Sequence, residues 1–374
     1  MRDETWNGVR ERVLSFIGRG WDANTADAEF DDIARFIFQF QFEHNAPYRS
    51  WCDRRRRTPD TIRHWTEIPA VPTGAFREVA LVCGTVADAQ AVFRTSGTTH
   101  GGQKRGSHYV RDLDLYHASL RSSFDATILC DGARPAMLSL LPRASEMPDS
   151  SLVHMVDNAI ATYGGGGSGN FATLAGGIDA HGLDKALRDS ENSGAPVCLL
   201  GTSLSFVHWL EVMQEAGRTY RLPAGSRLMD TGGFKGRSRA VPEEELRAAY
   251  GTRLGIGETF CINEYGMTEM ASQFYDSALR DHHEEAVVRD RRKLGPAWVR
   301  TRVVDPDTLM PLPPGGIGLL QHFDVANAGS VLAIQTEDLG VQVTDGFTLL
   351  GRATGAAPRG CSIAMDELLA AARG

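Results

Sequence analysis

The chain has 374 residues, a length that suits one large α/β domain or two unequal ones. Its 47 acidic residues outnumber 39 basic ones, and the net charge of -8 argues against nucleic acid or an anionic membrane as a partner. It has no apolar run of membrane-spanning length, no amino-terminal signal-peptide pattern and no zinc-site cysteine spacing, so we expect a cytoplasmic protein with reduced thiols.

Helix-like and strand-like patterns alternate along the chain. Apolar residues recur at helical spacing over residues 25–48 and predict an amphipathic helix that ends before Pro47. Short apolar runs predict strands at residues 79–83, 91–93, 137–141 and 197–200, and helical patterns occupy residues 113–124, 178–190 and 205–216. This alternation predicts an α/β fold with mixed, partly parallel sheets flanked by helices.

Neither a low-complexity linker nor an internal repeat divides the chain. The segment that follows Gly351 is too short to bury a core of its own. We therefore expect one large domain over residues 1–350, with a short appendage over residues 351–374.

A loop at residues 95–106 follows one of the predicted strands and combines hydroxyl groups, glycines and bases. Glycines let backbone N–H groups approach an anion, hydroxyl groups add donors, and Lys104 and Arg105 supply charge, which together suit a triphosphate. The loop is not a Walker A motif, because Gln103 precedes Lys104 and no serine or threonine follows it. From chemistry alone, a polar hairpin explains the loop equally well.

Two later segments place polar side chains directly after apolar runs. The first contains Tyr265, which can stack on a base, Thr268, which can bond a phosphate, and Glu269, which can hold magnesium. The second places Asp338 at a predicted strand end, where a carboxylate can bind a ribose diol. Taken singly, each segment is also explained by ordinary turn chemistry.

These three segments, followed by Gly351-Arg352, resemble the successive core motifs of adenylate-forming ligases, the superfamily of acyl-CoA synthetases and firefly luciferase. The resemblance narrows to the acyl-protein synthetase (LuxE-type) family through residues 40–48, 68–72, 151–155 and 359–362. It covers nearly the whole chain. It implies that residues 1–350 form an ATP-dependent adenylation domain, and that the full mobile carboxyl-terminal domain of ordinary superfamily members is lacking.

The resemblance implies a role for each residue at a matching position. The implied nucleotide contacts are Thr95, Ser96, Gly97, Thr98 and Thr99 at the phosphates, Gly232, Gly233, Phe234, Tyr265 and Gly266 at the adenine, and Asp338 with Arg352 at the ribose. Thr268 would bind the α-phosphate and Glu269 would bind Mg²⁺. Lys104 or Lys235 would take over from the lysine that the mobile domain delivers in ordinary members.

The implied reaction joins a carboxylic acid to the α-phosphorus of ATP, which yields an acyl-adenylate and pyrophosphate. In the family, the acyl group then passes to a cysteine near the carboxyl terminus and on to a reductase, and Cys361 occupies that place. Cys361 precedes a helix predicted at residues 362–372 with Ser362 as its N-cap, and it lies near Arg359. Both features stabilise a thiolate.

Several alternatives stay open. The acyl group could pass directly to a small-molecule or carrier-protein acceptor, which would leave Cys361 as a buried hydrophobe. An alternative from another functional class is a scaffold protein that binds a nucleotide but does not catalyse a reaction. Gly164, Gly166 and Gly169 match the G-x-G-x-x-G pattern of dinucleotide-binding proteins, but no good strand precedes them.

Overall fold

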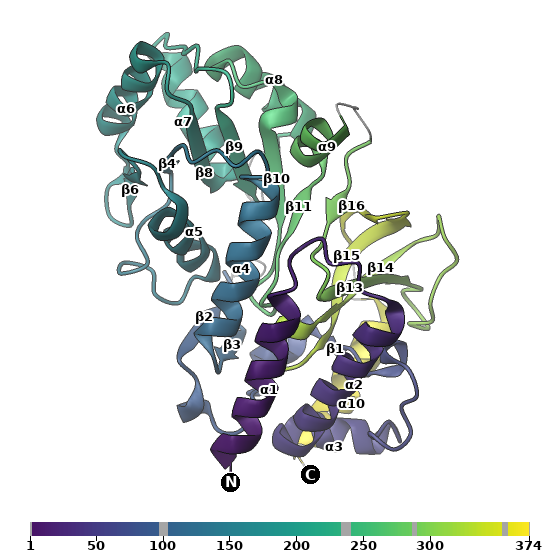
Figure 1. Ribbon diagram of the computed structural model, residues 1–374. Coiled ribbons are helices and arrows are strands. Elements are labelled where there is room, and N and C mark those ends of the chain that lie inside the picture. The colour runs from purple at the N-terminus through teal and green to yellow at the C-terminus, as the bar shows by residue number, and fades with distance from the viewer. Residues whose placement is uncertain (1, 97–103, 233–240, 286–289, 354–357, 374) are drawn as a thin grey trace.

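The computed structural model describes residues 2–96, 104–232, 241–285, 290–353 and 358–373 (Figure 1). The helices are α1 (Arg2–Ile17), α2 (Asp27–His44), α3 (Ala46–Arg54), α4 (Leu113–Thr127), α5 (Ser151–Tyr163), α6 (Ala180–Ser193), α7 (Ser203–Glu215), α8 (Glu243–Leu254), α9 (Ala278–Glu285) and α10 (Arg359–Arg373). Within these described ranges, none of the helices has the length and apolar character that crossing a membrane requires.

Most of the strands form one large mixed sheet, in the order β13-β14-β15-β16-β12-β11-β10-β9-β8-β4-β5. The strands on this path are β4 (Ala136–Ser139), β5 (Gly169–Asn170), β8 (Val197–Thr202), β9 (Arg227–Thr231), β10 (Cys261–Tyr265), β11 (Phe274–Asp276), β12 (Lys293–Leu294), β13 (Val299–Val304), β14 (Ile317–Asp324), β15 (Ala333–Val343) and β16 (Gly346–Arg352). Strand β1 (Val71–Pro72) joins β15, while β2 (Ala91–Arg94) and β3 (Ser107–Val110) pair separately, as do β6 (Ala172–Thr173) and β7 (Gly177–Ile178).

The sheet is parallel at one end and antiparallel at the other. Strands β5, β4, β8, β9 and β10 run parallel to one another. From β10 through β16 to β13, neighbouring strands are antiparallel. The predicted α/β fold with a mixed, partly parallel sheet is therefore confirmed, as are the strands expected near residues 91–93, 137–141 and 197–200.

Strand β8 is apolar from Val197 to Leu200, and helices cover both faces of the sheet at this strand (Figure 1). In β8, Val197 and Leu199 pack into the cluster formed with α6, α7 and α8. Between them, Cys198 and Leu200 pack into the second cluster, which includes residues of α4 and α5. Side chains alternate across a strand, so a continuous apolar run fills two separate cores.

The first three helices and the last one lie together beside the antiparallel strands, although they come from opposite ends of the chain (Figure 1). Helix α10 contacts α3 and β1. The buried Gln41 of α2 donates to the carbonyls of Asn327 and Ala328 at 3.1 and 3.2 Å, and it accepts from the N–H of Leu332 at 2.9 Å. These bonds tie the helical layer to the segment between β14 and β15.

The amphipathic helix predicted to end before Pro47 is α2, and a second helix follows it directly. Helix α2 ends at His44, and Asn45 caps the next helix by accepting from the N–H of Tyr48 at 3.3 Å. Pro47 lies in the first turn of α3. Since that turn has no internal partner for its N–H groups, a proline fits there without breaking a hydrogen bond.

The strand predicted at residues 79–83 is absent from the structure, which is described throughout this stretch. Leu81 and Cys83 are fully buried. The N–H of Cys83 bonds the carbonyl of Gly329 at 2.9 Å instead of joining a ladder. The apolar run therefore reflects burial in the core and not strand pairing.

Candidate functional site

Tyr265 and Asp338 meet at the centre of the candidate site. Tyr265 is the last residue of β10, and its hydroxyl donates to the Oδ2 atom of Asp338 in β15 at 2.8 Å. Burial and then the charge of Asp338 raise the pKa of the Tyr265 hydroxyl well above its usual value, so this group remains protonated as a donor. The structure thus brings the two residues predicted at the adenine and the ribose into direct contact.

Arg352 completes this group from the neighbouring strand. It lies opposite Asp338 in the β15–β16 ladder, and its Nε atom donates to Glu337 at 3.2 Å. Burial by itself would lower the pKa of Arg352. The hydrogen bond and charge of Glu337, together with the charges of Asp338 and Glu269, outweigh burial, so the pKa of Arg352 is raised. Asp338, Arg352 and Glu269 therefore share one electrostatic environment.

We expect Tyr265→Phe to raise the KM for ATP about tenfold with little change in kcat, because a hydrogen bond to a charged group contributes about 1.5 kcal/mol. The loss would remove one of the contacts that orient the Asp338 carboxylate. Initial rates at varied ATP measure the effect. Tyr250→Phe is a matched control, since that buried hydroxyl donates to Asp230 at 3.0 Å in another part of the sheet. An unchanged KM for ATP in Tyr265→Phe would argue against a ribose site at Asp338.

The turn after β10 carries Gly266, Thr268 and Glu269. The carbonyl of Thr268 lies 2.7 Å from the Nδ1 atom of His108, and the carbonyl of Glu269 accepts from Asn327 at 2.9 Å. His108 and Asn327 were not predicted from the sequence, where no spacing or motif singles them out. The backbone of the predicted phosphate and metal residues is thus held by two buried polar side chains.

A magnesium ion would suit the Glu269 carboxylate. The described part of the chain contains no cluster of three or more histidine, cysteine, aspartate or glutamate residues able to hold a metal. Magnesium in nucleotide enzymes is commonly held by one or two carboxylates together with substrate phosphates, so a single glutamate beside a triphosphate site is sufficient. The donor set therefore fits an ion that arrives with ATP.

The ends of the predicted phosphate loop are fastened together by the β2–β3 pair. The N–H of Thr95 bonds the carbonyl of Gly106 at 3.0 Å, and the N–H of Gly106 bonds the Thr95 hydroxyl at 2.9 Å. Ser96 and Lys104 are exposed, whereas Gly97, Thr98 and Thr99 lie outside the described residues. This closed base suits a loop that presents its tip to an anion, and it equally suits a polar hairpin.

The segment predicted at the adenine begins where β9 ends. Thr231 pairs with Glu264 in the parallel β9–β10 ladder, so Gly232 starts next to the strand that carries Tyr265. Gly232 has a φ of 74°, and its carbonyl accepts from Ser203 at 2.9 Å. Gly233, Phe234 and Lys235 lie outside the described residues.

Cys361 is buried near the candidate site. Helix α10 begins at Arg359, so Ser362 lies inside the helix and is not its N-cap. The Sγ atom of Cys361 lies 3.7 Å from the carbonyl oxygen of Thr336, two residues before Asp338, and the residue is 4% exposed. Burial and then the charge of Glu337 raise the pKa of the thiol to about 12, opposite to the direction expected from the sequence.

Comparisons with known proteins identify the family of the chain. A model of the family described as "Acyl-protein synthetase, LuxE" matches residues 180–370, the stretch that contains Tyr265, Glu269, Asp338 and Cys361. A long-chain-fatty-acid–luciferin-component ligase of Aliivibrio fischeri is 24% identical over 359 residues, which cover 91% of this chain and 88% of that protein. The corresponding ligase of Vibrio harveyi is 22% identical over 381 residues, and the match covers 96% of this chain and 93% of that protein.

Solved structures with a similar fold include 2-hydroxyisobutyryl-CoA ligase. Its complex with 2-HIB-AMP and CoA in the thioesterification state has a TM-score of 0.65 and is 17% identical, over 91% of this chain and 69% of that one. An open conformation of the same ligase has a TM-score of 0.64 at 15% identity, and the match covers 87% of this chain and 69% of that one. Similarity at this level of identity shows that the fold is shared.

Proposed function

The chain belongs to the LuxE family of acyl-protein synthetases, and from this membership we propose that it activates a carboxylic acid with ATP to give an acyl-adenylate. The observation that carries the proposal is the convergence of Tyr265, Asp338, Arg352 and Glu269 from β10, β15, β16 and the turn after β10. These residues offer an aromatic ring, a ribose acceptor, a cation and a metal ligand in one place. We assign this activity to residues 1–350.

In the proposed reaction, a carboxylate oxygen of the substrate attacks the α-phosphorus of ATP. The bond from that phosphorus to the bridging oxygen breaks, and pyrophosphate leaves. Tyr265 and Asp338 hold the adenosine, while Thr268 donates to the α-phosphate. Glu269 would hold Mg²⁺, which would supply positive charge to neutralise the phosphates. Lys104 contributes positive charge from the base of the phosphate loop.

In the second step, the acyl group passes from the adenylate to an acceptor, with release of AMP. We propose Cys361, in the appendage over residues 351–374, as the first acceptor, followed by a reductase or another partner. The burial of Cys361 means that α10 must shift before the thiol can react. The same burial favours a second candidate, in which a small molecule or carrier protein receives the acyl group directly.

We expect the protein to release pyrophosphate from ATP only when a suitable carboxylic acid is present. A coupled pyrophosphate assay with straight-chain, branched and aromatic acids measures this dependence. Reactions without an acid, and with the corresponding primary alcohols, serve as controls because neither supplies a carboxylate. Release of ADP and orthophosphate would contradict adenylation, and nucleotide binding without turnover for any acid would favour the scaffold alternative.

A further inference from the structure

His108 joins three segments that lie far apart in the sequence. It belongs to β3, which leads away from the phosphate loop, and it is 2% exposed. Its Nδ1 atom lies 2.7 Å from the carbonyl oxygen of Thr268, and its Nε2 atom lies 2.9 Å from the Oδ1 atom of Asn327. One side chain thus contacts both the turn after β10 and the segment between β14 and β15.

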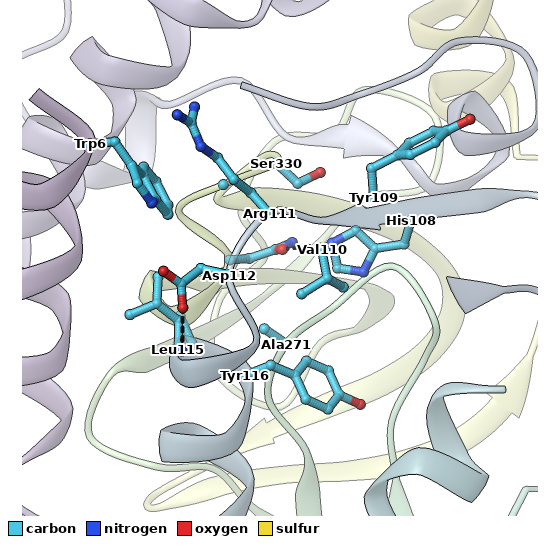
Figure 2. Close-up of a pocket in the computed structure, with 13 residues that line it drawn as sticks. Trp6, His108, Tyr109, Val110, Arg111, Asp112, Leu115, Tyr116, Ala271 and Ser330 are labelled. Carbon is cyan, nitrogen blue, oxygen red and sulfur yellow. Dashed lines mark hydrogen bonds between the residues drawn. The ribbon is translucent and has the colours of Figure 1, made fainter. Parts of the chain in front are cut away.

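Figure 2 shows His108 directed towards the interior of a small pocket, while its neighbour Tyr109 points away from it. This difference follows from the alternation of side chains along a strand. Ala271 and Asn327 line the same pocket. His108 therefore faces the turn that carries the proposed phosphate and metal residues.

Asn327 is oriented by its own hydrogen bonds. Its Nδ2 atom donates to the carbonyls of Glu269 and Val331, both at 2.9 Å. Reversing the amide would turn Oδ1 towards two acceptors, so Oδ1 is the atom that faces His108. The carbonyls of Thr268 and Glu269, which are consecutive in the chain, are therefore both held by one contacting pair of side chains.

Both ring nitrogens of His108 face oxygens that can only accept, the Thr268 carbonyl at Nδ1 and Asn327 Oδ1 at Nε2. Burial lowers the pKa of His108 to about 4, so the ring is neutral near pH 7 and has one N–H group. A neutral ring can donate to only one of these oxygens, and donation from Nδ1 to the Thr268 carbonyl at 2.7 Å is the bond that holds the turn. The bond from Nδ1 to Thr268 is thus the functional link.

The next part of the turn has a separate anchor. Asp324 accepts from the N–H groups of Ala271 and Ser272 at 3.0 and 2.9 Å. Loss of the His108 contact would therefore loosen the peptide that joins Thr268 to Glu269, while Ala271 and Ser272 remain fixed and Asn327 still holds the Glu269 carbonyl. This separation makes the contribution of His108 measurable without dismantling the whole turn.

We propose that His108 is a positioning residue for acid activation, which acts by fixing the backbone from which the Thr268 and Glu269 side chains reach the α-phosphate and magnesium. This inference rests on the proposed function. The bond between Nδ1 and the Thr268 carbonyl contributes most to this positioning. Asn327, which contacts the other ring nitrogen, assists by holding the Glu269 carbonyl. The expected signature is a change in turnover and in magnesium dependence, not in affinity for the carboxylic acid.

The test compares His108→Phe, which fills the space but removes both polar contacts, with His108→Asn, whose amide nitrogen can replace Nδ1. We expect His108→Phe to lower kcat about 10- to 100-fold and to raise the magnesium concentration needed for half-maximal rate, because displacing catalytic groups by about 1 Å costs rates of this order. The KM for the acid should change little. His108→Asn should recover most of the lost rate.

Tyr48→Phe is the matched control for stability. The Tyr48 hydroxyl is also fully buried and donates to a backbone carbonyl, that of Pro69, at 2.8 Å in the helical layer. Thermal unfolding and active-site concentration are measured for each variant, so that rates refer to folded protein. Tyr48→Phe should lower stability and leave the magnesium dependence unchanged.

Two results would overturn the positioning role of His108. One is a His108→Phe variant with unchanged kcat and magnesium dependence per folded molecule. The other is a folded His108→Asn variant that is as slow as His108→Phe. A wild-type protein that releases no pyrophosphate with any acid would count against the proposed function instead, so the two failures are distinguishable.

Discussion

Glu269→Gln is expected to lower the rate of pyrophosphate release about 100-fold or more, the loss typical of removing one group that stabilises charge in a transition state. Glutamine keeps the size of the side chain but loses the negative charge that we propose binds Mg²⁺. Glu269 is 8% exposed and influences the pKa of Arg352, so the charge lies inside the site and is poorly screened by water. Initial rates at saturating ATP and varied magnesium measure the loss.

Glu258→Gln provides the matched control for this substitution. Glu258 pairs with Arg247 at 3.1 Å, and its side chain is 67% exposed. Exposed ion pairs contribute little to stability, so this variant should behave as wild type. Near-normal turnover of Glu269→Gln at limiting magnesium would contradict the metal assignment and move it to another carboxylate, with Glu264 on the adjoining strand as the first to test.

Cys361→Ser is expected to abolish covalent acyl-protein formation while acyl-adenylate formation continues. The residues that we propose for adenylation lie on β10, on β15, on β16 and in two loops, and none of them supplies a thiol. Serine is close in size to cysteine, so α10 should keep its packing near Thr336. Intact-mass analysis after incubation with ATP, magnesium and an acid measures the acyl-protein, and hydroxylamine treatment identifies the thioester.

Cys130→Ser controls for labelling of another thiol. Cys130 is more exposed than Cys361, and burial raises its pKa only to about 11, so it is the better candidate for nonspecific acylation. Labelling should persist in this variant. Survival of labelling in Cys361→Ser, or absence of labelling in wild type with an acid that supports pyrophosphate release, would favour direct transfer and leave Cys361 as a packing residue.

The alternation of apolar runs and helical patterns was sufficient to predict the α/β fold with a mixed sheet. Hydrophobic periodicity is a local property, so β2, β4 and β8 could be recognised without knowing their neighbours. The order of the motifs around Thr95, Tyr265, Asp338 and Arg352 indicated the adenylate-forming superfamily, and residues 40–48, 68–72, 151–155 and 359–362 narrowed the resemblance to the family. Local patterns failed at residues 79–83, where an apolar run is buried without joining a strand, because periodicity does not record hydrogen-bond partners.

Contacts between distant segments depended on the tertiary structure. The bond from Tyr265 to Asp338 spans 73 residues and follows from the path of the sheet between β10 and β15, which no local pattern encodes. The same holds for His108, whose two partners lie 160 and 219 residues away. At Cys361 the tertiary structure reverses the direction of the pKa shift expected from the sequence. Its sequence neighbours suggest a stabilised thiolate, but the packing of α10 buries the thiol and raises its pKa. The cost of desolvating a charge depends on surroundings that only the folded chain supplies.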